Sequence, residues 1–289
     1  MRGERAWAAL FVGPAALLAG FYLVLPTLQT VYLSFFDRNS QALVGLDNYR
    51  YMFTNAAVQT AFRNNLLWLV VFTAGTVLLG LVLAVLLDRV RYEAVAKSII
   101  FLPMAISFAG AGVIWRFMYA YRPPGADQIG LLNQVVVALG GTPRAWLIEQ
   151  PWINNLALIG AGIWIWTGFC LVIISAAYKG IPKDMLEAAR VDGANELQVF
   201  RHISLPSLYP TLAVITTTMI INVMKIFDIV YVMTNGQFGT EVLANRMYKE
   251  MFQFRHFGRA SAVAVVLLAV AAVVMVGNIR RFKREEEMR

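Results

Sequence analysis

The stretch YKGIPKDMLEAARVDGANELQVFRHISLPSLYP, Tyr178–Pro210, is the longest polar interval of the chain, and a long apolar run flanks it on each side. Its residues predict structure and not a mobile loop. Pro182 suits the first position of a helix, where its missing N–H is not needed, and Gly193 suits a left-handed cap that ends a helix. Asn195 with Gln198 three residues later is typical of a capping box that begins a second helix. The pattern therefore predicts two short helices that form a rigid polar knob at a membrane surface.

The composition places the chain among membrane proteins. Its 289 residues are 59% hydrophobic and only 15% charged, and the mean hydropathy is +0.61. Apolar residues gathered in long runs favour a bundle of membrane helices. The net charge of +8 lies largely in short loops and the tail, where it orients membrane helices, so nucleic acid is not an expected partner. Cys170 is the single cysteine, which excludes a disulfide framework, and no HExxH or CxxC spacing supports a metal site.

We expect an all-α integral membrane protein with six transmembrane helices. Pro206 is expected to stop the second helix of the polar stretch before the fifth span begins. In FLPMAIS, residues 101–107, a proline is expected to break the third span, and GLLNQVVVALG, residues 130–140, is expected to form an external helix. The predicted spans are Ala6–Phe36, Asn65–Leu87, Ser98–Trp115, Asn154–Ala177, Ser207–Met233 and Ala260–Ile279.

The polar stretch also carries a family resemblance. EAARVDGA, residues 187–194, followed by ISLP, residues 203–206, resembles the EAA signature of the membrane subunits of binding-protein-dependent ABC importers. This resemblance implies a MetI-like permease core of the type I importers, with residues 1–36 as an N-terminal helix and 37–289 as the core. In that family the loop at 178–210 docks into a separate ATPase subunit. The residues that the resemblance assigns to ATPase coupling are Glu187, Ala188, Ala189, Asp192, Gly193, Leu205 and Pro206.

Other segments resemble carbohydrate permeases, and among them the maltose and α-glucoside permeases. YRPPGADQIGLLN, residues 121–133, and NGQFGTEVLANRMYKEMFQF, residues 235–254, carry this resemblance. It implies import of an oligosaccharide or α-glucoside. It also implies a second homologous permease chain, two ATP-binding cassette ATPase subunits and an extracytoplasmic sugar-binding protein. Many relatives have GGP where this chain has Gly236-Gln237-Phe238, which leaves the sugar open, and another small polar solute such as glycerol phosphate is the alternative.

No GxxxxGK[ST] string occurs, so the chain lacks the phosphate cradle of P-loop ATPases. We therefore expect ATP and Mg²⁺ to bind the partner ATPase, with no cofactor in this chain. A secondary transporter would need ion sites at mid-membrane, for which only Lys225 and Asp228 are candidates. A membrane enzyme would need His, Asp or Glu clustered at one membrane face, which the sequence does not show.

Polar and aromatic residues of the fourth and fifth spans are candidates for a substrate path. Charged groups inside a membrane face the bundle interior or a polar path, and Lys225 and Asp228, three residues apart, are expected to share one helix face. A structural ion pair without a role in transport explains these two residues equally well. The resemblance to maltose permeases implies sugar contacts from one face of each of these two spans. At helical spacing these faces hold Gly162, Trp166 and Phe169 of the fourth span and Met219, Asn222 and Ile226 of the fifth, which plain helix packing also explains.

The distribution of Lys and Arg predicts the orientation. With the N-terminus inside, the inner segments hold more of these residues than the outer ones, which is the arrangement that membrane insertion favours. The chain is thus expected to cross the bacterial inner membrane, surrounded by lipid, with both termini and the 178–210 loop in the cytoplasm.

Overall fold

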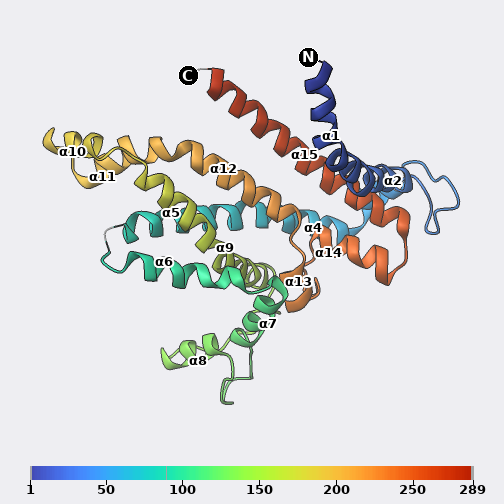
Figure 1. Cartoon of the computed structure of the whole chain (residues 1–289). Coiled ribbons are helices and arrows are strands. Elements are labelled where there is room, and N and C mark those ends of the chain that lie inside the picture. Colours follow the sequence, from blue (N-terminus) through green and yellow to red (C-terminus); the bar gives the residue numbers. More distant parts are fainter. Residues whose placement is uncertain (1, 89, 288–289) are drawn as a thin grey trace. The chain divides into compact units, whose positions relative to one another are not determined.

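The computed structural model describes residues 2–88 and 90–287, with side chains for 10–88 and 90–277. Over these residues the chain is helical and has no strand, only one isolated bridge between Phe36 and Leu43 (Figure 1). Five helical runs in this part are long and apolar enough to cross a membrane, and a bent pair makes a sixth. The predicted all-α membrane fold is confirmed. The chain divides into two compact units, Met1–Gln59 with Arg246–Val270, and Thr60–Asn245 with Ala271–Arg289.

The helix α9 (Ile153–Lys179) is the central element of the second unit, and 61% of the residues in its most apolar stretch are buried. Small residues let neighbouring helices approach it closely, as is common in membrane bundles. A Cβ at Gly168 would lie 2.6 Å from the carbonyl oxygen of Ile100, and one at Gly80 would lie 2.6 Å from Cβ of Cys170. Cys170 is fully buried, as expected for a small core residue.

The second span is longer than predicted. It runs from Ala56 to Leu87, whereas we expected it to start at Asn65. It consists of α4 (Ala56–Leu67), a π-helical turn η2 (Trp68–Phe72), called a wide turn below, and α5 (Thr73–Leu87). Asn55 begins it early, because its side-chain oxygen accepts hydrogen bonds from the N–H groups of Ala57 and Val58 at 3.0 and 3.3 Å. Such capping satisfies amides that have no partner inside the helix.

The third span is broken, as the proline predicts. The helix α6 (Glu93–Phe101) passes into a 3₁₀ turn, η3 (Leu102–Ala105), and α7 (Phe108–Met118) then leaves at an angle of 102°. Ser107 caps α7, and its hydroxyl oxygen accepts a hydrogen bond from Gly110 N–H at 3.1 Å. The predicted external helix is present as α8 (Leu131–Ala138).

The fifth span ends earlier than predicted. The helix α12 (Leu205–Met224) stops at Lys225, and a separate short helix, α13 (Asp228–Met233), follows. After α13 the chain forms α14 (Leu243–Tyr248), the wide turn η5 (Lys249–Gln253) and α15 (Phe257–Glu287). The apolar part of α15, Phe257–Gly277, is the last candidate span.

In the first unit, α1 (Arg2–Ala19), a wide turn η1 (Gly20–Val24) and α2 (Leu25–Leu33) form one continuous helical run. No residue of the span Leu10–Leu33 is buried, so its apolar surface is left for lipid or another chain. A short helix, α3 (Asp47–Thr54), follows. Within the same unit Gly258 lies against the chain after α2, because a Cβ there would come 2.0 Å from the carbonyl oxygen of Phe36.

A buried ion pair joins α3 to the chain before α15. Glu250 is 1% exposed, and its carboxylate accepts from Arg246 at 2.6 Å and from the Tyr51 hydroxyl at 2.9 Å. The guanidinium of Arg259 lies 3.7 Å from the centre of the Tyr51 ring. Glu250 is the acid that compensates the Arg246 charge in this set, so its loss leaves that cation without a counter-charge.

Glu250→Ala is expected to destabilise the protein by about 3 kcal/mol, because it leaves the Arg246 charge buried and uncompensated. Thermal unfolding of the detergent-purified protein measures this as a lower Tm. Glu149→Ala removes the exposed Arg144–Glu149 pair, whose atoms lie 3.9 Å apart, and is the control, since exposed pairs contribute little. Equal Tm values for the two variants would contradict the assignment.

Candidate functional site

The polar stretch between α9 and α12 forms the two predicted helices, α10 (Lys183–Val191) and α11 (Glu196–Val199). Gly193 has a φ of +87°, the left-handed conformation that glycine adopts without strain. The capping box is present, because Asn195 and Gln198 each accept a hydrogen bond from the other's backbone N–H, at 2.8 and 2.9 Å. Pro182 is one residue earlier than expected, in the capping position before α10.

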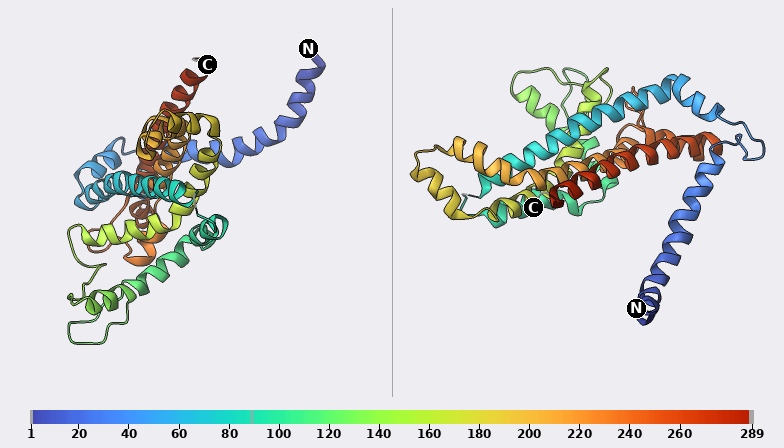
Figure 2. Two further views of the ribbon diagram at one scale, coloured as in Figure 1. Left: turned by 90° about the vertical axis from the view of Figure 1, so that its left-hand side faces the viewer. Right: turned by 90° about the horizontal axis from the view of Figure 1, so that it is seen from above.

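An ion pair holds the two short helices together. Arg190 Nε donates to Glu196 Oε1 at 2.9 Å across the turn, and this hydrogen bond raises the pKa of the Arg190 guanidinium. At the other end of the loop, Lys179 Nζ lies 2.7 Å from Glu93 Oε2. The loop is therefore fixed internally and is also tied to the start of α6. Figure 1 and the right view of Figure 2 show α10 and α11 projecting at the ends of α9 and α12.

The predicted coupling residues lie in three places. Ala189, Asp192 and Gly193 line a shallow hollow of about 480 Å³ together with part of α11, whereas Glu187 and Ala188 are exposed on α10 outside its lining. Leu205 and Pro206 instead open α12. The loop thus presents a concave surface lined by the Asp192 carboxylate and a separate exposed carboxylate at Glu187, which suits docking to another protein.

Pro206 does not stop the second helix, and that prediction was wrong. The helical run continues from Glu196 to Met224, because a wide turn, η4 (Phe200–Ser204), precedes the proline. The N–H of Leu205 reaches back five residues to the carbonyl of Phe200. The same arrangement precedes Pro26, where Leu25 N–H bonds to the carbonyl of Gly20. A turn with one extra residue lets a helix continue past a residue that cannot donate.

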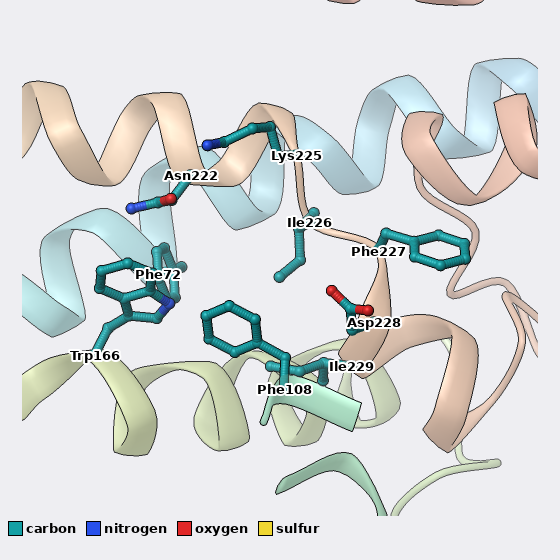
Figure 3. A pocket seen from close by; sticks show the side chains of 9 residues that line it. All are labelled: Phe72, Phe108, Trp166, Asn222, Lys225, Ile226, Phe227, Asp228 and Ile229. Carbon is teal, nitrogen blue, oxygen red and sulfur yellow. The ribbon is translucent and has the colours of Figure 1, made fainter. Parts of the chain in front are cut away.

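A cavity of about 200 Å³ lies inside the second unit, where α7, α9, α12 and α13 meet (Figure 3). Figure 3 shows Trp166 and Phe108 on one side, with Asn222 and Lys225 of α12 on the other. The lining therefore combines aromatic rings with an amide, an ammonium and a carboxylate. Its residues are Phe72, Phe108, Trp166, Asn222, Lys225, Ile226, Phe227, Asp228 and Ile229.

Five predicted path residues line this cavity: Trp166, Asn222, Lys225, Ile226 and Asp228. The other three candidates lie elsewhere. Phe169 packs edge-on against Trp166, with ring centres 5.6 Å apart. Met219 is fully buried in the core. A Cβ at Gly162 would lie 3.0 Å from the Trp68 ring, so this glycine allows close helix packing.

Lys225 and Asp228 do not share a helix face, which corrects the prediction. Lys225 is the residue that ends α12, and Asp228 is the first residue of α13, because the chain leaves the helix between them. Both are exposed, and no ion pair between them occurs in the described part of the chain. Figure 3 shows the Lys225 side chain running back above Asn222, while the Asp228 carboxylate points into the cavity. The cavity therefore offers two separate charges.

Sequence reasoning missed four lining residues, Phe72, Phe108, Phe227 and Ile229. Phe72 and Phe108 come from the second and third spans, and no spacing in the sequence links them to α9 and α12. Phe227 and Ile229 flank Asp228, so the expected continuous helix hid the break that places them at the cavity. For the described residues, no group of three or more His, Cys, Asp or Glu side chains is placed to hold a metal ion.

Comparison with known proteins agrees with the fold. The sequence model of the family described as "Binding-protein-dependent transport system inner membrane component" matches residues 76–282. The osmoprotective compounds uptake permease protein GgtC of Synechocystis sp. is 60% identical over 97% of this chain and all of its own. The alpha-glucoside transport system permease protein AglF of Rhizobium meliloti is 49% identical over 97% of this chain and 83% of its own.

Solved structures give the same fold. A chain of a bacterial ABC transporter that imports alginate superposes with a TM-score of 0.82 at 22% identity, over 98% of this chain and 96% of its own. The alginate transporter in complex with a pentasaccharide-bound periplasmic protein gives 0.79 at 23% identity, over 98% and 95%. The EAA signature of the 178–210 loop, the broken third span and the family match agree. The chain belongs to the family of binding-protein-dependent transport system inner membrane components, the multi-pass permease subunits of ABC importers.

Proposed function

We propose that the chain conducts a carbohydrate, which is an oligosaccharide or α-glucoside, through the cavity where α7, α9, α12 and α13 meet. The observation that carries this proposal is the pairing of the Trp166 indole with the Asn222 amide across one cavity. An aromatic ring offers a sugar an apolar face to stack on, and convergent polar groups bind its hydroxyls. The separate charges of Lys225 and Asp228 add a donor and an acceptor. The name of the 49% identical relative, an alpha-glucoside transport permease, supports a glycoside.

The 178–210 loop is proposed to couple this cavity to ATP hydrolysis in partner chains. We infer two ATP-binding cassette subunits, which would bind ATP and Mg²⁺, a second homologous permease and an extracytoplasmic sugar-binding protein. The periplasmic protein in the complex with the alginate transporter supports the last of these. Glu187, exposed on α10, would meet the ATPase.

The bias of Lys and Arg toward the inner segments supports an orientation with both termini and this loop in the cytoplasm. A cytoplasmic reporter fused after Arg289 is expected to be active in cells, and a reporter that works only outside the membrane is expected to be silent. Activity of the external reporter would contradict the proposed orientation.

Glu187→Lys is expected to abolish sugar uptake while the protein remains in the membrane. The reversed charge would repel a basic docking surface on the ATPase, and like charges at an interface cost several kcal/mol. Co-purification of the ATPase measures docking, and labelled sugar uptake measures coupling. Glu149→Lys makes the same charge change on a different loop and serves as the control. Undiminished uptake by Glu187→Lys would refute the role of this residue.

Trp166→Ala and Asn222→Ala are each expected to reduce sugar affinity in the purified importer by several-fold to about a hundredfold. Loss of a stacking ring or a hydrogen bond to a buried polar group costs on the order of 1–3 kcal/mol. ATP hydrolysis stimulated by the docked binding protein should persist, because it does not run through these side chains. Trp152→Ala, at the exposed start of α9, is the control. Wild-type transport by both cavity variants would show that these faces are ordinary packing.

A further inference from the structure

The segment that follows α13 holds its backbone in an uncommon conformation. Of the five residues 235–239, four have a positive φ: Asn235, Gly236, Phe238 and Gly239. Glycine adopts such values freely, and asparagine tolerates them. Phe238, with a φ of +57°, is strained, because a Cβ in the left-handed region crowds the next carbonyl oxygen. Strain of this kind persists only where the surrounding structure imposes it.

Buried asparagines of two membrane helices impose this conformation. Asn154 of α9 donates to the carbonyl oxygen of Phe238 at 2.7 Å. Asn64 of α4 donates to the carbonyl oxygens of Gly239 and Glu241, at 2.7 and 2.8 Å. Both asparagines are 0% exposed. The helix bundle therefore fixes the backbone at the strained residue and directly after it.

The phenyl ring that this backbone carries lies outside the core. Phe238 is 41% exposed, and it does not line the cavity of Figure 3. Small or polar residues flank it in the chain, namely Asn235, Gly236, Gln237, Gly239 and Thr240. One aromatic ring within a polar rim is typical of the anchors that carry most of the energy of a protein–protein interface. A lipid-facing surface is instead apolar over a wide area, as in the span Leu10–Leu33.

Phe238 lies at the opposite end of α9 from the 178–210 loop. Its hydrogen-bond partner Asn154 is in the first turn of α9, and Lys179 is the last residue of this helix. The 27 residues of α9, at about 1.5 Å each, make a helix of about 40 Å, which exceeds the hydrocarbon core of about 30 Å. With the 178–210 loop in the cytoplasm, as proposed, the phenyl ring faces the outside.

We propose that Phe238 anchors the extracytoplasmic sugar-binding protein, and that Asn64 and Asn154 hold its ring in the docking position before that protein arrives. This inference rests on the proposed function, which supplies the partner. A ring and a backbone that are already ordered lose less entropy on association, so pre-organisation increases the affinity. The strain lowers the stability of the chain alone, and the docked partner gains the ring contact.

Photocrosslinking in intact cells tests which molecule touches this residue. Phe238→p-benzoylphenylalanine places a photoreactive ring at the anchor. Illumination is expected to link the chain to an extracytoplasmic solute-binding protein, identified by mass spectrometry. The same substitution at Phe117, which is 71% exposed on α7, is the control and is expected not to link that protein. A product with lipid or with another permease chain, no product at position 238, or equal yields at both positions would overturn the proposal.

The linked protein, once purified, is used to measure the contribution of the anchor. Phe238→Asn removes the ring and relieves the strain, since asparagine tolerates a positive φ. It is expected to weaken binding of that protein to the purified importer about tenfold or more, while the Tm stays at or above that of the wild type. Phe238→Tyr keeps the ring and is expected to bind within about twofold of the wild type.

Three results would overturn the anchor alone. Wild-type binding by Phe238→Asn would make Phe238 an ordinary surface residue, and weaker binding with a lower Tm would make it a ring that supports the fold. Equal losses in Phe238→Asn and Phe238→Tyr would show that the partner does not recognise a ring. The sugar path is tested separately, because an unaltered sugar affinity in Trp166→Ala would overturn the path and leave the anchor standing.

Discussion

Backbone hydrogen bonding is the constraint on which this structure depends. In the hydrocarbon region each N–H and C=O must find a partner inside the protein, so irregular backbone occurs only where protein covers it or a cavity opens beside it. The chain has three Leu-Pro pairs within its apolar runs, at Pro26, Pro103 and Pro206. Wide turns let the helices continue past the first and the last. At Pro103 a tight 3₁₀ turn leads to the break of the third span.

The two breaks in the membrane helices of the second unit meet at the same cavity. One lies between η3 and α7, and the other at residues 226–227, between α12 and α13. Phe108 follows the first break, and Lys225 and Asp228 flank the second. All three line the cavity. The places where the helices fail to continue are therefore the places where charged and aromatic side chains reach a common space, as in other transporters with discontinuous helices.

The helix α9 connects this cavity to the 178–210 loop. Trp166 lies on its side, and Lys179 is its last residue before α10. Close contacts at Gly168 and Gly80 pack it against α6 and α5. The ion pair from Lys179 to Glu93 ties the same end to α6, which leads through the bend to Phe108. The loop and the cavity are thus linked by two helices that are themselves joined.

The sequence by itself determined the class of the fold, the six candidate spans and the two short helices of the 178–210 loop. These are local properties, since a capping box such as Asn195 with Gln198 and a left-handed turn at Gly193 depend on neighbouring residues, and apolar runs reveal their own length. Trp166 and Asn222 were also predicted, from the resemblance and the helical spacing. The helix boundaries were less accurate, because Asn55 extended the second span and a break at Lys225 ended the fifth span earlier.

Only the tertiary structure decided which side chains share the cavity. Phe72 and Phe108 are distant from α9 and α12 in the chain, and no spacing connects them. Met219 and Gly162 have the right helical period, yet the packing of neighbouring helices turns them to the core and to a helix contact. The separation of Lys225 from Asp228 depends on where α12 stops. The helix continues past Pro206 because a wide turn precedes it. Sequence periodicity shows which residues share a face of one helix, but the partner of that face is chosen by packing between helices, which depends on the whole bundle.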